Sequence, residues 1–158
     1  MESMFSELLD PEELRQALDK YNSKKIVFTN GCFDLLHPGH VTYLAQARSL
    51  GDLLVVGLDT DASVRSLKGD SRPILPESAR AKNLTALRSV DYVCFFSNGD
   101  PEPLIKIVKP DVLVKGGDWS PEQIRGSEFV LSYGGEVKSL SFIEGFSTTS
   151  IVEKIQSF

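Results

Sequence analysis

The sequence has few of the features that mark membrane-bound or secreted proteins. Its longest apolar stretches, such as residues 53–58, are far shorter than the roughly 20 residues that span a bilayer. The first residues, 1–9, contain acids and lack the basic start of a signal peptide. We therefore expect a cytoplasmic protein with no membrane partner.

Positive charge and cysteine are also scarce. The chain has 17 lysines and arginines against 22 acids, a formal net charge of −5. A chain this acidic has no overall field to hold DNA or RNA, so any anion must be captured locally. The two cysteines, Cys32 and Cys94, lie in unrelated segments and form no metal-type pair. They are predicted to be reduced thiols, although the sequence leaves a disulfide open.

What the 158 residues do contain is a regular alternation of strand and helix patterns. It predicts one doubly wound, Rossmann-like α/β domain with a mostly parallel sheet of about five strands. Residues 1–22 are expected to form an N-terminal helical extension and residues 23–158 the main domain. Strands are predicted at 26–29, 52–58, 92–96, 112–114 and 137–140. Helices are predicted within 5–21, 41–50, 60–67, 77–87, 101–108, 120–133 and 148–155.

The loop after the first predicted strand carries the strongest functional signal, because such sheets bind ligands at the carboxyl ends of their strands. His37 and His40, the only histidines, are three residues apart, so both rings can face one side of a helix that begins at Pro38. Gly31 and Gly39 leave room for a phosphate, and the free N–H groups of the first turn attract anions. The loop is predicted to hold a polyphosphate. The alternatives are incidental histidines at a helix start, or a metal pair that lacks further nearby ligands.

His37-Pro38-Gly39-His40, following the turn Gly31-Cys32-Phe33-Asp34, resembles the HxGH signature of the cytidylyltransferase-like nucleotidyltransferases. The resemblance implies that both histidines contact the triphosphate and stabilise charge at the reacting α-phosphorus. Asp34 matches a family position, where it either orients the turn or helps to hold a metal; a simple turn-capping role explains it equally well. The expected nucleotide-binding residues are Asn30, Gly31, Cys32, Phe33, Asp34, Gly39, Gly116, Ser147, Thr148 and Thr149.

Asp61 and Arg80 match positions of this family, and Lys68 and Trp119 lie in predicted polar loops. All four are candidates for catalysis or substrate binding, each with a plain alternative. Lys68 is expected to bind a phosphate as a mobile charge, and otherwise is a solvated lysine. Asp61 is equally explained as a helix N-cap, Arg80 as a surface arginine, and Trp119 as a minor core contact. The proposed substrate-binding set is Asp61, Arg80, Lys115, Asp118 and Trp119.

The segment Glu144-Gly145-Phe146-Ser147-Thr148-Thr149 precedes the last predicted helix. Its hydroxyl groups and the helix start suggest a second anion or nucleotide site, and Ser147 or Thr148 also suits a helix N-cap. Glycerol-phosphate members of the family have an arginine where this chain has Phe142. The groups that this arginine contacts in those members must be bound by other residues in this chain.

Longer strings, including Leu67-Lys68-Gly69 and Val114-Lys115-Gly116-Gly117-Asp118, resemble the branch of the family that makes ADP-heptose. This resemblance covers about residues 25–156. It implies that ATP and D-glycero-β-D-manno-heptose 1-phosphate give ADP-heptose and pyrophosphate for the lipopolysaccharide core. It also implies Mg²⁺ held mainly by phosphates, with no metal ligand from the protein, and a homodimer or higher homo-oligomer. Because no kinase half is present, a stand-alone adenylyltransferase is expected.

Two alternatives remain at this stage. The same chemistry with CTP and glycerol 3-phosphate, or another alcohol phosphate, fits the motif equally well. A nucleotide sensor without catalytic activity would keep the fold, although the intact histidine pair argues against it.

Overall fold

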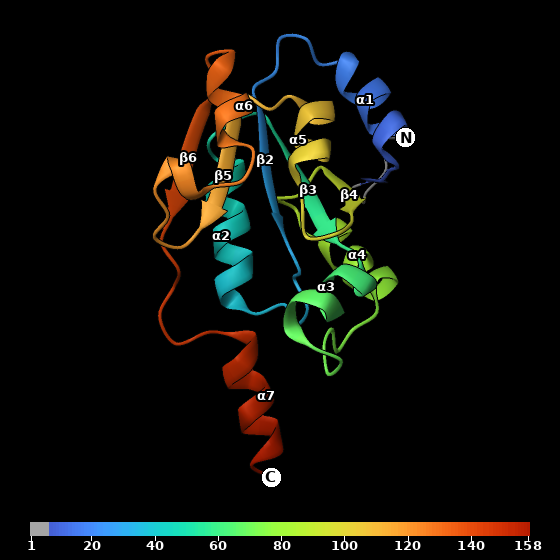
Figure 1. Ribbon diagram of the computed structural model, residues 1–158, viewed down its shortest axis with the longest axis vertical. Coiled ribbons are helices and arrows are strands. Elements are labelled where there is room, and N and C mark those ends of the chain that lie inside the picture. The colour runs from blue at the N-terminus through green and yellow to red at the C-terminus, as the bar shows by residue number, and fades with distance from the viewer. Residues whose placement is uncertain (1–6) are drawn as a thin grey trace.

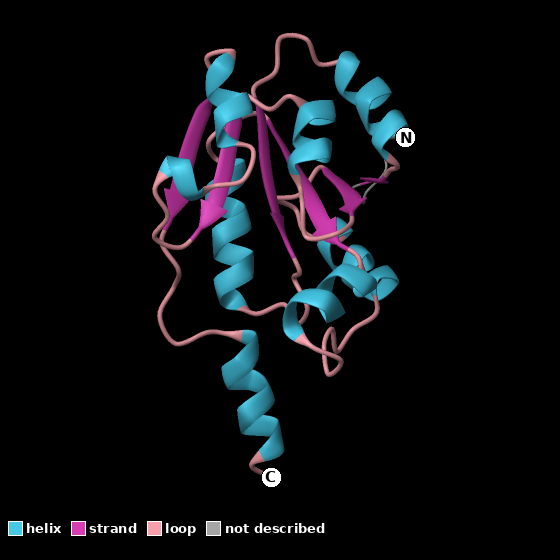
Figure 2. Ribbon diagram, in the orientation of Figure 1, coloured by secondary structure: helices cyan, strands magenta, loops and turns pink. Residues whose placement is uncertain are grey.

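A computed structural model describes residues 7–158 and shows a six-stranded sheet in which every strand pairing is parallel (Figures 1 and 2). The strand order is β1-β4-β3-β2-β5-β6, so the chain winds outward from β2 in one direction and later in the other. This confirms the doubly wound fold. The strands are β1 Glu7–Leu8, β2 Ile26–Gly31, β3 Leu53–Asp59, β4 Tyr92–Phe96, β5 Val112–Gly116 and β6 Glu136–Leu140.

Helices connect the strands and cover both faces of the sheet (Figure 2). They are α1 Pro11–Asp19, α2 Pro38–Arg48, α3 Asp61–Lys68, α4 Glu77–Thr85, α5 Glu102–Val108, α6 Ser127–Ser132 and α7 Thr148–Gln156, with a 3₁₀ turn at Pro121–Gln123. Helix α1 lies within the predicted range 5–21 and begins at Pro11, where Asp10 and Glu13 form a capping box at its start.

The strands divide the core into two layers. Along β2, Phe28 faces a layer that also contains Leu14 and Leu18 of α1, while Val27 faces the layer formed by α2 and α4. This alternation is typical of strands buried on both faces. Because Leu14 and Leu18 are 0% and 1% exposed, the described part of the N-terminal extension completes the core rather than standing free of it.

Two local predictions were wrong. The predicted count of about five strands missed β1, a two-residue edge strand beside β4, because the helical spacing over 5–21 was extended too far towards the N-terminus. Residues 5 and 6 of that prediction lie outside the described residues. The single helix predicted over 120–133 is instead the 3₁₀ turn and α6, separated at Gly126. Gly126 has φ +84, and a Cβ there would lie 2.6 Å from Ile105 Cδ1, so only glycine fits.

The topology places the carboxyl end of β2 between those of β3 and β5, at the point where the winding changes direction. Helix α7 extends away from this edge of the sheet (Figure 1), and none of its residues is buried. Three segments that are far apart in the sequence therefore meet at one end of the molecule. They are the turn after β2, the end of β5 and the start of α7.

Candidate active site

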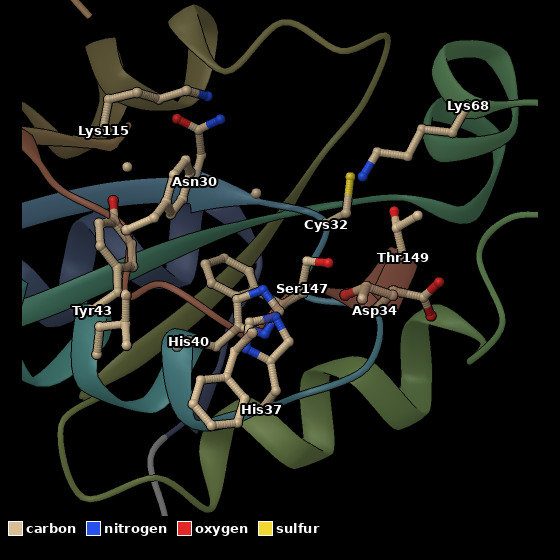
Figure 3. A pocket seen from close by; sticks show the side chains of 18 of the residues that line it. Asn30, Cys32, Asp34, His37, His40, Tyr43, Lys68, Lys115, Ser147 and Thr149 are labelled. Carbon is tan, nitrogen blue, oxygen red and sulfur yellow. The ribbon is translucent and has the colours of Figure 1, made fainter. Parts of the chain in front are cut away.

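A cavity of about 440 Å³ lies at this edge of the sheet (Figure 3). Its walls come from the turn after β2, the first turns of α2, the end of α3, the end of β5 and the segment that leads into α7. The lining residues are Asn30, Gly31, Cys32, Phe33, Asp34, His37, Gly39, His40, Tyr43, Lys68, Arg72, Lys115, Gly116, Phe142, Ile143, Phe146, Ser147, Thr148 and Thr149.

The two histidines lie together at the start of α2, as the spacing predicts. His37 is the N-cap residue and Pro38 is the first helical residue. The rings of His37 and His40 stack with their centroids 3.8 Å apart and their planes 22° from parallel. The Nδ1 atom of each ring is buried and has no hydrogen-bond partner within the described chain. Both side chains line the cavity beside the free N–H groups of a helix start, and each keeps an unpaired Nδ1 atom enclosed within the protein.

Burial shifts both imidazoles towards the neutral form. Burial, reinforced by neighbouring His37, lowers the pKa of His40 to about 4. Burial also lowers the pKa of His37. A bound anion would favour the cationic form, because its negative charge raises the pKa of the ring.

The glycines of the loop make room for aromatic rings. A Cβ at Gly39 would lie 2.9 Å from His37 Cε1 and Nδ1, and a Cβ at Gly31 would lie 3.0 Å from Phe33 Cε2. Phe33 has φ 46 and packs edge-on against His40, with the ring centroids 5.3 Å apart. The space that the sequence assigned to a phosphate at these two glycines is thus partly filled by side chains. Those side chains fix the position of the histidine pair.

Asp34 is 5% exposed and binds the backbone of the loop between α3 and α4. Its carboxylate accepts hydrogen bonds from the N–H groups of Ile74, at 2.8 and 3.0 Å, and Leu75, at 2.9 Å. It also lies 3.4 Å from Arg72 Nη1. Asp34 thus ties the turn after β2 to the loop between α3 and α4.

Arg80 and Asp61 do not line the cavity. Arg80 is 0% exposed and pairs with Asp61 at 2.7 Å. It also donates hydrogen bonds to the carbonyl oxygens of Cys32, Asp59 and Leu75. The surface-arginine alternative is excluded, and direct substrate contact is blocked because every donor nitrogen is engaged inside the protein. Asp61 is the first residue of α3, and its N-cap is Thr60, so the N-cap alternative for Asp61 was also wrong.

The remaining charged and aromatic candidates divide between the cavity and the surface. Lys68, at the end of α3, and Lys115, on β5, both line the cavity. Asp118 and Trp119 do not. Trp119 is 45% exposed, and its indole N–H donates to the Gly116 carbonyl at 3.0 Å. The indole thereby braces the end of β5.

The segment before α7 forms the opposite wall. Ser147 caps α7 in a reciprocal hydrogen-bonded box with Ser150, so the predicted capping role holds. Thr148 and Thr149 line the cavity beside it. Phe142, which is 71% exposed, places its ring against the backbone of β5, since a Cβ at Gly116 would lie 2.9 Å from Phe142 Cε1.

Several wall residues were missed by the sequence analysis. Tyr43 lies one helical turn after His40 and is held by a 2.6 Å hydrogen bond to Thr29, so extending the histidine face of α2 would have found it. Arg72, in the loop after α3, also lines the cavity and was not predicted as a site residue. Ile143 and Phe146 carry no chemical signal of their own, although the centroid of the Phe146 ring lies 6.4 Å from that of His37.

Within residues 7–158, no group of three or more histidine, cysteine or acidic side chains is arranged to hold a metal. Over the same residues, no helix is long and apolar enough to cross a membrane.

Comparison with known proteins agrees with this geometry. Residues 28–154 match the family model described as cytidylyltransferase-like. The chain belongs to this family, which confirms the resemblance seen in the sequence.

Two curated relatives are similar over most of this chain. The chain is 55% identical over 147 residues to the bifunctional protein HldE of Hahella chejuensis, covering 92% of this chain and 31% of that protein. It is 56% identical over 137 residues to the HldE of Pelobacter propionicus, covering 87% and 28%. The chain thus spans about three tenths of the length of these curated relatives.

Solved structures also match. The lipopolysaccharide core biosynthesis protein of Thermoplasma volcanium is 30% identical, with a TM-score of 0.62 over 77% of this chain and 98% of that one. Pantothenate synthetase of Thermus thermophilus, at 16% identity and a TM-score of 0.64 over 91% of this chain and 66% of that one, shares the fold.

Proposed function

We propose that this chain is an adenylyltransferase that transfers AMP from ATP to a sugar 1-phosphate and releases pyrophosphate. The observation that carries the proposal is the stacked His37–His40 pair, with unused Nδ1 atoms at the start of α2. Family membership supports nucleotidyl transfer. The similarity to HldE proteins and to a lipopolysaccharide core biosynthesis protein supports D-glycero-β-D-manno-heptose 1-phosphate as the acceptor and ADP-heptose as the product.

The proposed reaction is an in-line attack by a phosphate oxygen of the sugar on the α-phosphorus of ATP. This oxygen is already ionised near neutral pH, so the chain needs no strong general base. Catalysis then consists of positioning the two substrates and stabilising the negative charge of the transition state. We assign this stabilisation to His37, His40, Lys68 and the N–H groups at the start of α2.

Mg²⁺ is expected to arrive as Mg·ATP. The cavity carboxylate, Asp34, is already engaged with Arg72 and two backbone N–H groups. This suits a cation held mainly by phosphate oxygens and water, as is common for Mg²⁺ bound with nucleotides. Cytoplasmic location and a homodimeric or larger assembly belong to the same proposal.

Pyrophosphate release tests the proposal directly. Purified protein is incubated with each nucleoside triphosphate and with heptose 1-phosphate, other sugar 1-phosphates or glycerol 3-phosphate. Release that requires ATP and heptose 1-phosphate is the expected result. Release with CTP and glycerol 3-phosphate would replace the proposal with the cytidylyltransferase alternative, and nucleotide binding without release in any mixture would favour a sensor.

A further inference from the structure

Lys115 differs from an ordinary surface lysine. It stands at the carboxyl end of β5, lines the cavity and is only partly exposed. Among residues 7–158, its ammonium group makes no hydrogen bond or ion pair within contact distance. A partly buried ammonium without a direct partner is unfavourable, because it loses water without gaining an equivalent interaction.

The groups around Lys115 compensate its charge incompletely. Burial lowers the pKa of Lys115, and the electrostatic influence of Cys32 and Asp59 opposes that change. Burial raises the pKa of the Cys32 thiol, which leaves Asp59 as the opposing acid. Asp59 is 4% exposed, one of its carboxylate oxygens has no hydrogen-bond partner, and the other lies 4.0 Å from Cys32 Sγ. Asp59 therefore acts on Lys115 electrostatically without a direct ion pair, and the Lys115 ammonium remains available to a ligand in the cavity.

Lys68 approaches the same place from the opposite wall. Figure 3 shows Lys68 and Lys115 reaching towards the cavity from opposite sides, with Asn30 and Cys32 between them. Lys68 interacts with the Cys32 thiol and acts electrostatically on His40. Lys68 is therefore close to both the Lys115 cluster and the histidine pair.

We propose that Lys115 binds the phosphate of the acceptor, in a subsite separate from the histidine pair that receives the nucleotide, with Lys68 facing both from the opposite wall. This inference rests on the proposed function and assigns the acceptor's place within the same cavity. Two phosphates must approach each other in the reaction, and their mutual repulsion is reduced when each has its own cation. The bond is formed beside Lys68, from the acceptor oxygen to the α-phosphorus, while the bond to pyrophosphate breaks.

The test separates the two subsites by their substrates. Lys115→Gln should raise the KM for heptose 1-phosphate by about 10-fold or more, the loss expected for a charge-assisted contact. The dissociation constant of ATP should stay within about twofold of the wild-type value, because ATP would not touch this lysine. Lys115→Arg should recover most of the acceptor affinity. The matched control is Lys82→Gln, on an exposed position of α4, which should leave both values unchanged.

A binding measurement without turnover tests the acceptor subsite separately from the proposed reaction. Heptose 1-phosphate and glucose 1-phosphate are titrated into the protein saturated with α,β-methylene-ATP, which cannot transfer its nucleotide. Weaker sugar-phosphate binding in Lys115→Gln supports the subsite even if the wild-type chain releases no pyrophosphate. Equal loss of ATP and acceptor binding, or no loss of either in a folded variant, would overturn it.

Discussion

His37 and His40 are placed in contact although each leaves a buried nitrogen unpaired. An unsatisfied buried polar group costs about 1–3 kcal/mol. Such a cost is recovered when a ligand supplies the missing partner, since phosphate oxygens accept hydrogen bonds from imidazole N–H groups. The arrangement is therefore better suited to the complex than to the empty protein.

His37→Ala and His40→Ala should each lower kcat by about 100-fold or more, as expected for the loss of a transition-state donor. The urea midpoint should change little for His37, which is a cap residue without a side-chain cap bond. Single-turnover AMP transfer measures the effect, and Val41→Ala, at a 44% exposed position of the same helix, is the control. Near-normal turnover in both histidine variants would remove them from the mechanism.

ATP should raise the pKa of His40. In the empty protein this pKa is about 4, and a polyphosphate beside the ring stabilises the protonated form. The complex then holds more protons than the free protein between the two pKa values, so this group strengthens ATP binding as the pH falls through that window. Because the chain has only two histidines, NMR titration of the imidazole signals gives both values, with His37→Gln for assignment. An unchanged pKa in the complex would contradict the proposed contact.

Gly39→Ala should impair catalysis more than stability. Its methyl group would lie 2.9 Å from the ring of His37, so the ring must turn away, while alanine itself suits a helix. We expect a fall of about 10–100-fold in kcat/KM, since small displacements at a reacting centre have large effects. Gly69→Ala is unsuitable as a control because φ is +93 there. Ala45→Gly, exposed on α2, tests helix propensity alone.

The sequence was informative about some of these residues and silent about others. The spacing of His37 and His40 predicted their shared face, because a helix begins at Pro38 whatever the rest of the fold does. The buried position of Arg80 could not be predicted, because an isolated arginine in a helical pattern is usually exposed to solvent. Only the meeting of α4 with the ends of β2 and β3 shows that it is buried.

At the scale of secondary structure elements, Arg80 is the anchor that joins α4 to the ends of β2 and β3. Arg80→Ala should lower the free energy of unfolding by about 3–5 kcal/mol, because it leaves Asp61 and three carbonyl groups without their donor. Chemical denaturation measures this loss. Arg88→Ala, at an exposed position just after α4, should have an effect below about 0.5 kcal/mol. Similar midpoints for the two variants would show that the buried contacts contribute little.

Helix α7, unlike α4 with its buried Arg80, has no buried residue, although Thr148 and Thr149 at its start line the cavity. A nine-residue helix without tertiary support is marginal in water. Its backbone amides should therefore exchange with solvent much faster than those of α2, and Mg·ATP should slow them by about 10-fold or more if Ser147–Thr149 bind the nucleotide. Hydrogen exchange followed by mass spectrometry provides the measurement, with α2 as the internal reference. Protection of α7 equal to that of α2 without ligand would contradict this description.

Most elements were predictable because apolar patterns report burial: helices from their spacing, and strands such as Leu53–Asp59 and Tyr92–Phe96 from continuous apolar runs. The errors arose where periodicity gives no signal. Strand β1 is too short to alternate, and it exists because its backbone pairs with β4. The break at Gly126 depends on the approach of Ile105 from another helix, which no local pattern contains.

At the scale of the whole molecule, parallel topology explains why separate motifs meet. Asp59 is the last residue of β3, and Asn30 and Lys115 lie one residue before the ends of the neighbouring strands β2 and β5. The sheet alone therefore brings their surroundings together. This was predictable from the alternation of strands and helices. Which side chains enter the cavity was not, because this depends on the path of the loops: Lys115 enters, whereas Asp118 and Trp119 remain outside.

The two core layers lie on the faces of the sheet, whereas most of the cavity wall is built from segments beyond the strand ends. Changes at Phe142, Ile143 or Phe146 thus alter the wall without opening a void between sheet and helices. Substitutions at these positions are therefore expected to change the shape of the cavity while the folding free energy stays nearly constant. A single scaffold of this kind is free to diversify in specificity without first acquiring spare stability.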